Sequence, residues 1–170
     1  TGSELGMNTI SNGKIEVVEF KEFANTTILS INAYRDSLLL LGSGGSGFAV
    51  YNPVTKNYRL ITTHDGLTSD FIYFIVADDD DTIWVGTEKG ISRVVLDKKL
   101  DIVENIHFDH DNGLLGVETN QNSFSFQGDT KMFGLIDGVY RFNKPPNRET
   151  TSFEVHLTDV EVFYGQDPSR

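Results

Sequence analysis

The stretch that decides the fold is DTIWVGTEKGISRV, residues 81–94, in which apolar residues alternate on both sides of a polar turn. Two glycines four residues apart, Gly86 and Gly90, bracket that turn. Alternation with a period of two is typical of β-strands, and a short polar turn containing glycine is typical of a hairpin. By itself, the stretch predicts two antiparallel strands.

The same skeleton recurs along the chain. Residues 129–142, DTKMFGLIDGVYRF, repeat its spacing, and residues 36–51, DSLLLLGSGGSGFAVY, repeat it with one extra residue in the turn. The N-terminal TGSELGMNTI, residues 1–10, looks like the second half of a further copy. The copies follow one another at intervals of 40 to 48 residues, as their first glycines show: Gly2, Gly42, Gly86 and Gly134.

A second marker keeps the same period. The stretch HDGLTSDFI at 64–72 corresponds to DNGLLGVETN at 111–120, which places Gly66 and Gly113 47 residues apart. Self-similarity at a fixed period of this length is typical of solenoids and propellers.

Residues 71–110 give the clearest single period. FIYFIVA (71–77) is the apolar run expected of a strand buried on both faces, DDDD (78–81) is a turn, and three alternating runs follow. Four short strands with no helical stretch between them predict an antiparallel meander, which is the blade of a β-propeller.

The predicted fold class is therefore all-β, a partial β-propeller of about three and a half four-stranded antiparallel blades. We assign residues 1–145 to propeller repeats, as a partial blade at 1–21 and blades at 27–63, 71–109 and 119–143. A closed ring takes ~4 to 8 blades, so a blade face at each end is left open. Large open apolar faces favour association, and we expect a homo-oligomer formed through them.

The repeats resemble the two-component regulator propeller family. That resemblance implies the periplasmic sensor region of a hybrid two-component histidine kinase of the kind found in polysaccharide-degrading Bacteroidetes. It further implies a carbohydrate or oligosaccharide ligand, regulation of transcription, and a membrane span and a kinase elsewhere in the full-length protein. Residues 146–170 resemble a linker and the first strands of the immunoglobulin-like domain that follows such propellers. The matching residues are Gly66, Leu67, Ser69, Ile72, Ile75, Asp78, Ile83, Trp84, Val85, Gly86, Thr87, Gly90 and Ile91.

The composition is acidic, with 25 Asp and Glu against 14 Lys and Arg and a formal net charge of −11. Such a surface repels phosphate backbones, so we expect no nucleic-acid binding by this segment. The longest apolar run, LLLL at 38–41, is far too short to cross a bilayer, so we expect no membrane contact by this segment either. The absence of cysteine excludes disulfides and Cys metal sites.

Several residues invite a chemical role. Asp109, Asp111, Gly113 and Glu118 approach the spacing of a calcium loop, but they fall one residue short of it and no helix is predicted beside them. An interblade turn is the preferred interpretation, and we expect no metal or cofactor. Trp84 could stack on a sugar, although its place in the alternating strand favours core packing. No nucleophile or metalloprotease motif is present, so we expect no catalytic residue.

Topology gives better candidates for ligand contact. When the first strand of each blade lines the axis, the turn between the second and third strands and the connection to the next blade emerge on one face of the ring. This predicts a binding module. A propeller glycosidase or lyase and a protein-interaction scaffold stay open as alternatives. The polar candidates on that face are Asp70, Glu88, Lys89, Glu118, Asn120 and Asp137.

Overall fold

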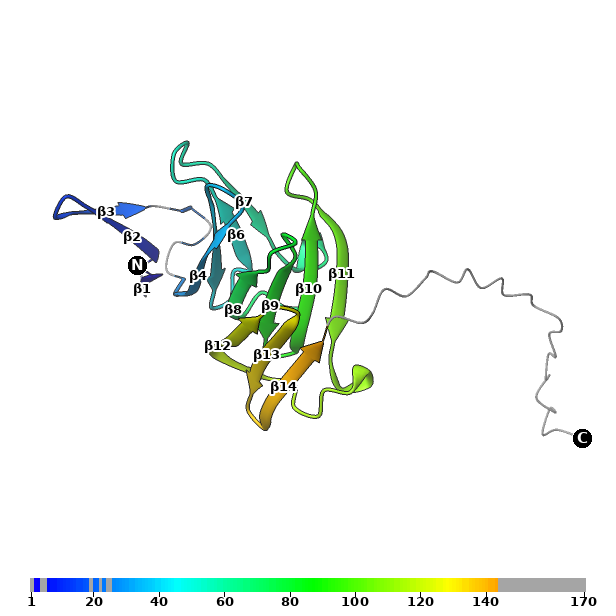
Figure 1. Ribbon diagram of the computed structural model, residues 1–170. Helices are drawn as coiled ribbons and strands as arrows, with labels where there is room; N and C mark the ends of the chain where they lie inside the picture. Colours follow the sequence, from blue (N-terminus) through cyan, green and yellow to red (C-terminus); the bar gives the residue numbers. More distant parts are fainter. Residues whose placement is uncertain (1, 4–5, 19, 22, 24–25, 144–170) are drawn as a thin grey trace, which may run out of the picture.

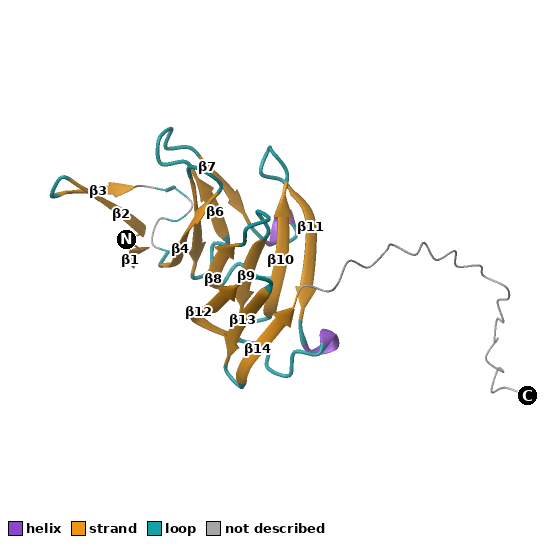
Figure 2. Cartoon of the chain, viewed as in Figure 1, coloured by secondary structure: helices purple, strands orange, loops and turns teal. Residues whose placement is uncertain are grey.

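The computed structural model describes residues 2–3, 6–18, 20–21, 23 and 26–143 (Figure 1). Antiparallel sheets and two 3₁₀ helices of three residues each make up this part of the chain (Figure 2). The fold class is confirmed as all-β, a partial β-propeller with four-stranded antiparallel blades. The linker and immunoglobulin-like strands expected at 146–170 lie outside the described residues.

Each sheet follows the order of the chain, as in a meander. Blade 1 contains β1 (Gly2–Ser3), β2 (Gly6–Ser11) and β3 (Lys14–Val18). Blade 2 contains β4 (Ile28–Tyr34), β5 (Leu38–Ser43), β6 (Phe48–Tyr51) and β7 (Tyr58–Ile61). Blade 3 contains β8 (Ile72–Ala77), β9 (Ile83–Thr87), β10 (Gly90–Leu96) and β11 (Ile102–Phe108). Blade 4 contains β12 (Thr119–Gln127), β13 (Thr130–Leu135) and β14 (Gly138–Asn143).

Three apolar clusters join successive blades and form the core. Alternate residues of a strand point to opposite faces of a sheet, so blade 2 sends Leu41 and Tyr51 toward blade 1 but Leu40 and Val50 toward blade 3. Blades 2 and 3 are therefore apolar on both faces. Five residues that the pattern predicts as most buried are fully buried, which confirms that interpretation: Ile72, Phe74, Ile75, Ile83 and Val85.

The first strands β4, β8 and β12 contact one another and form the inner edge of the blades (Figure 1). An inner strand lacks a neighbour on one side of its own sheet, so its backbone groups need partners elsewhere. Side chains of β4 supply two of them: Ser30 Oγ accepts the Ile75 N–H at 3.2 Å, and Asn32 Nδ2 donates to the Ile75 carbonyl at 2.8 Å.

The repeated glycines have two distinct physical reasons. In β9, a Cβ on Gly86 would overlap the ring of Phe74, and in β5 a Cβ on Gly42 would lie 2.8 Å from Ile72 Cγ2. These glycines permit close approach of a neighbouring side chain. Gly47 and Gly90 instead adopt positive φ values, 73° and 123°, which L residues rarely adopt.

The interblade connections also repeat. A 3₁₀ helix at Thr63–Asp65 and another at His110–Asn112 each end in a left-handed glycine, Gly66 or Gly113. Thr62 and Asp65 form a reciprocal capping box around the first of them. This equivalence explains the second sequence marker, because both copies build the same turn between blades.

Candidate functional site: the loop face and the mouth of the axis

The hairpin turns and interblade connections meet at one end of the blades. The N–H groups of Gly45 and Gly47, in the β5–β6 turn, donate to the Asp70 carbonyl at 3.2 and 2.8 Å. In the next pair of blades, the Ile136 N–H of the β13–β14 turn donates to the Glu118 carbonyl at 3.0 Å. In blades 2 and 4, the hairpin turn is thus bonded to the connection that follows the blade or leads into it, and these loops form one continuous face.

Asp70 and Lys89 lie on this face and contact backbone groups of the connection before β8. The Asp70 carboxylate accepts the Thr63 N–H at 2.7 Å and the Thr63 hydroxyl at 3.0 Å. Lys89 is exposed, and its Nζ lies 3.5 Å from the Thr68 carbonyl. Asp70 therefore braces the loop, whereas the ammonium of Lys89 is presented to solvent.

Glu88 and Glu118 are half-buried and each accepts a hydroxyl from another segment. Ser69 Oγ lies 2.7 and 2.8 Å from the two oxygens of Glu88. Glu118 Oε1 accepts the Tyr73 hydroxyl at 2.6 Å, which joins the connection before blade 4 to the inner strand of blade 3. Each carboxylate links two segments of the loop face by a hydrogen bond. Both are only half-buried, so their negative charges remain near the protein surface.

Tyr73 and Phe71 form an aromatic pair beside these carboxylates. Phe71 is exposed, and its ring centroid lies 5.0 Å from that of the half-buried Tyr73. The hydrogen bond to Glu118, followed by burial and the charges of Glu118 and Glu88, raises the pKa of Tyr73 to about 12. The pair stands at the start of β8 and is therefore at the mouth of the axis.

The sequence analysis missed this pair because it interpreted residues 71–77 as buried on both faces. That interpretation is wrong for Phe71 and Tyr73, which point out of the core while Ile72 and Phe74 are fully buried. The hydroxyl of Tyr73 within an otherwise apolar run could have signalled a face toward the axis, because a buried tyrosine hydroxyl needs a hydrogen-bond partner.

Amide side chains of β12 close the mouth on its other side. Gln121 Nε2 and Asn122 Nδ2 both donate to the Leu29 carbonyl at the start of β4, at 3.3 and 3.0 Å. Blade 4 thereby contacts blade 2 directly, through two exposed amide side chains at the start of the inner strands.

The remaining two candidates make their side-chain hydrogen bonds within blade 4. Asn120 belongs to β12 rather than to the preceding connection, and its Nδ2 donates to the Leu135 carbonyl within blade 4 at 3.0 Å. Asp137 is exposed at the tip of the β13–β14 turn, where its carboxylate accepts the Tyr140 hydroxyl at 2.6 Å. Asp70, Glu88 and Lys89 instead contact the connection before blade 3, and Glu118 contacts the inner strand of that blade.

The residues with calcium-like spacing are dispersed among other roles. Asp109 caps the second 3₁₀ helix by accepting the Asp111 N–H at 2.9 Å, whereas Glu118 turns away to Tyr73. Among the described residues, no three His, Cys, Asp or Glu side chains gather in a way that could hold a metal ion. The interblade turn explains the spacing.

One cluster has the composition of a hydrolytic triad. His107 Nδ1 lies 3.2 Å from Ser92 Oγ and 3.1 Å from Thr68 Oγ1, and His107 Nε2 lies 3.7 Å from Asp109 Oδ2. Ser92 is only 1% exposed, however, so a substrate cannot reach its hydroxyl. The cluster ties the connection before blade 3 to β10 and β11.

Solved structures of other proteins share the fold of this chain. The chain has the fold of the extracellular domain of a hybrid two-component system from B. thetaiotaomicron, with a TM-score of 0.68 and 14% identity over 85% of this chain. A second such domain from the same organism gives a TM-score of 0.64 and 19% identity over 84% of this chain. The chain spans about a fifth of the length of either structure, 19% and 20%.

A curated protein is also similar in sequence. Histidine kinase P4 of Formosa agariphila is 29% identical over 94 residues, which are 51% of this chain and 7% of that protein. No family model matches the chain. In the part of the chain that the structure describes, no helix is long and apolar enough to cross a membrane.

Proposed function

We propose that this chain is part of the extracytoplasmic, ligand-binding sensor region of a hybrid two-component histidine kinase. The repeats belong, in this proposal, to the two-component regulator propeller family, and the segment lies in the periplasm. Its ligand is a neutral carbohydrate or oligosaccharide, and binding passes a signal across the membrane that regulates transcription. The fold shared with extracellular domains of hybrid two-component systems and the similarity to a histidine kinase support this proposal.

The observation that carries the proposal is the exposed aromatic pair at the mouth of the axis. Phe71 presents an apolar ring to solvent beside Tyr73, whose hydroxyl donates to the carboxylate of Glu118. The exposed amides of Gln121 and Asn122 belong to the same group of inner strands, where they donate to the Leu29 carbonyl. Binding sites for small molecules combine apolar or aromatic surface with a few convergent polar groups. An aromatic ring suits the C–H face of a pyranose, and the carboxylate and amide groups suit its hydroxyls.

The charge of the site favours a neutral over an anionic saccharide. Asp70, Glu88 and Glu118 contribute carboxylates to the same loop face, and the chain as a whole has a net charge of −11. Like charges repel an anionic ligand, most strongly where water is excluded. Uronate-rich or sulfated sugars are therefore disfavoured.

Binding fits the geometry better than catalysis does. A glycosidase needs two carboxyl groups flanking the scissile bond, one of them free to donate or accept a proton. Here Glu88 and Glu118 are each occupied by a hydroxyl of the protein, Ser69 or Tyr73. The segment is therefore proposed to have no enzyme activity of its own.

Titration calorimetry with a panel of neutral and anionic oligosaccharides tests the proposal. We expect at least one neutral saccharide to bind and to be recovered intact after prolonged incubation. Cleavage of the saccharide would favour the propeller-enzyme alternative, and the absence of binding across the panel would contradict the sensor proposal.

A further inference from the structure

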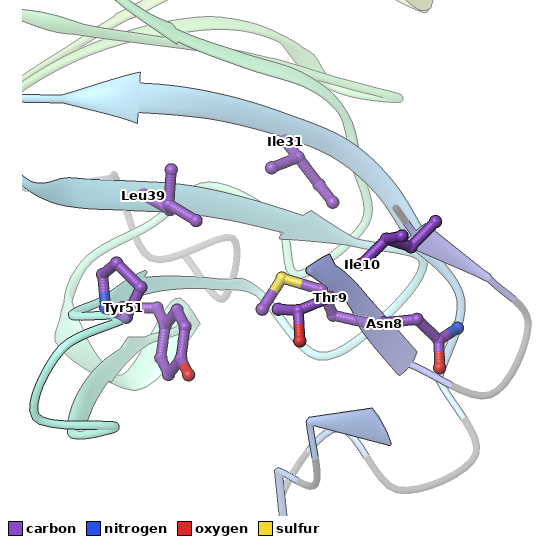
Figure 3. A pocket seen from close by; sticks show the side chains of 8 residues that line it. Asn8, Thr9, Ile10, Ile31, Leu39 and Tyr51 are labelled. Atoms are coloured by element: carbon purple, nitrogen blue, oxygen red, sulfur yellow. The ribbon is translucent and has the colours of Figure 1, made fainter. Parts of the chain in front are cut away.

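Apolar surface is accessible both between blades and on the loop face. Figure 3 shows a groove of about 390 Å³ between β2 and blade 2, with Ile31 and Leu39 on one side. Both side chains pack against the core cluster that joins blades 1 and 2, so the groove belongs to the packing of those blades. On the loop face, by contrast, the side chains of Leu29 and Phe71 lie beside Gly44, at the junction of blades 2 and 3.

Gly44, directly after β5, is a glycine that the fold does not require. Its φ lies outside the positive range, unlike those of Gly45 and Gly47 in the same turn. A Cβ built on Gly44 would lie 3.5 Å from Leu29 Cδ1 and 3.6 Å from Phe71 Cζ, which are ordinary van der Waals contacts. Alanine would therefore fit at this position, so neither backbone conformation nor close packing explains the glycine.

The equivalent positions of the next two blades carry side chains. In the register of each second strand with its inner strand, Gly44 corresponds to Glu88 in blade 3 and to Ile136 in blade 4. An isolated antiparallel bridge between Gly44 and Phe71 holds the exposed ring at this place. The glycine therefore leaves room for one methyl-sized group between Phe71 and the half-buried Leu29.

The next junction, between blades 3 and 4, has a polar version of the same arrangement. The register places three polar residues at the positions that flank the methyl-sized room in blade 2: Glu88, Tyr73 and Glu118. The Tyr73 hydroxyl donates to Glu118 at 2.6 Å, and the ring centroids of Tyr73 and Phe71 are 5.0 Å apart. An apolar place and a polar place thus lie side by side at the mouth of the axis.

We propose that the room beside Gly44 is an apolar subsite of the mouth that takes a methyl group of the ligand. This inference rests on the proposed function, because it names the class of saccharide that the mouth binds. The ligand carries a neutral sugar with a methyl group, either a 6-deoxyhexose or an N-acetylhexosamine. The methyl group contacts Leu29 and Phe71, and hydroxyl groups of the ligand face the polar place at Glu118. Gly44 is then a specificity-determining residue, because any side chain there would occupy the subsite.

Pairs of sugars that differ at one methyl group test this inference. L-Fucose is compared with L-galactose, and N-acetylglucosamine with N-formylglucosamine, by calorimetric titration of the chain. We expect the methyl-bearing sugar of one pair to bind about fourfold more tightly than its partner, which is the gain from burying one methyl group. The pair that shows the preference distinguishes a 6-deoxyhexose from an N-acetylhexosamine.

Gly44→Ala separates this subsite from the rest of the mouth. The added methyl group fills the subsite, so we expect the preference to disappear while the midpoint of thermal unfolding stays close to that of the parent chain. Gly138→Ala is the matched control, because its new methyl group meets no heavy atom within 4 Å, and it should keep the preference. Leu29→Ala removes one wall of the subsite and should also reduce the preference, which provides a second test if Gly44→Ala folds poorly.

The outcomes separate this inference from the proposed function. Equal affinity within both pairs, or a preference that persists in Gly44→Ala and Leu29→Ala, would overturn the inference alone. The same conclusion would follow if the chain bound a neutral oligosaccharide but none of the four sugars. A chain that bound no saccharide at all would overturn the proposed function and this inference together.

Discussion

At the scale of single residues, the second strands need their repeated glycine because a neighbouring side chain occupies the space that a Cβ would fill. Gly86 faces the ring of Phe74 and Gly42 faces Ile72, so both positions exclude a side chain even though their φ values are ordinary. Gly138 differs, because no heavy atom lies within 4 Å of a Cβ built on it.

Replacement of Gly86 by valine should lower the free energy of unfolding by about 1 to 3 kcal/mol, because the new side chain must displace the buried ring of Phe74. Gly138→Ala is the control and should change stability by less than about 0.5 kcal/mol. Urea denaturation of the two variants measures both effects. Equal stability of Gly86→Val and the parent would show that the close approach carries no cost.

Trp84→Ala should cost about 3 to 5 kcal/mol, because the indole is 6% exposed and packs against Phe108, Phe133 and Phe142. Its Nε1–H also donates to Asp78 at 3.2 Å. Chemical denaturation measures the loss, and Trp84→Phe should recover part of it. If the alanine variant kept full stability but lost saccharide binding, the core interpretation of Trp84 would be wrong.

Core residues could be predicted from the sequence, whereas the partners of polar residues could not. Alternation identified Ile83 and Val85 because burial follows from strand period and needs no knowledge of neighbours. Glu118 was a candidate by its place in a connection, but its bond to Tyr73 joins residues 45 positions apart. Such a contact depends on how two blades are oriented, which no local pattern encodes.

At the scale of elements, side chains rather than sheet pairing join the inner strands of different blades to one another. Ser30 and Asn32 on β4 bind the backbone of Ile75 on β8, and Tyr73 on β8 binds Glu118 before β12. The sequence analysis left Asn120 in the overlap between the connection at 111–120 and the blade at 119–143, and the structure places it in β12. The start of this strand could not be located from the sequence because TNQN carries no apolar alternation.

The Tyr73–Glu118 bond predicts a stability change at alkaline pH. Glu118 raises the pKa of Tyr73 to about 12 from the ordinary value of 10.0, so the folded state favours the neutral phenol. This stabilisation is complete below pH 10 and is lost as the pH rises through about 12, because between these values the phenol ionises in the unfolded chain while it stays neutral in the folded one.

Ultraviolet titration of the phenolates measures the pKa of Tyr73, taken as the difference between the titration curves of the parent chain and of Tyr73→Phe. Glu118→Gln should move the Tyr73 transition toward the ordinary pKa, because the hydrogen bond to the carboxylate is the largest cause of the shift. An unchanged transition in Glu118→Gln would contradict the assigned cause.

At the scale of the whole molecule, the two end blades leave faces uncovered. Ile10, Ile15 and Val17 are 63%, 70% and 66% exposed on the outer face of blade 1. The equivalents of Ile10 in blades 2 and 3, Tyr51 and Val94, are buried by the preceding blade. The repeat therefore shows that such a face is built to be covered by another blade.

We propose that the isolated chain forms a homo-oligomer through these open faces, and Ile15→Lys should weaken it because it places a charge in the contact. Light scattering over a range of concentrations measures the association. Glu16→Lys, on the opposite face of the same strand, is the matched control and should leave association unchanged. A parent chain that stays monomeric at every concentration would defeat the proposal.

The most direct test of the account is the affinity of the mouth of the axis for a neutral saccharide, measured by calorimetry for the parent chain, Phe71→Ala and Val54→Ala. Val54 is 82% exposed in the β6–β7 turn, at the end of the blade opposite the loop face, and serves as the control. The account predicts a loss of about tenfold or more for Phe71→Ala and no change for Val54→Ala. Equal affinity of Phe71→Ala and the parent would contradict it.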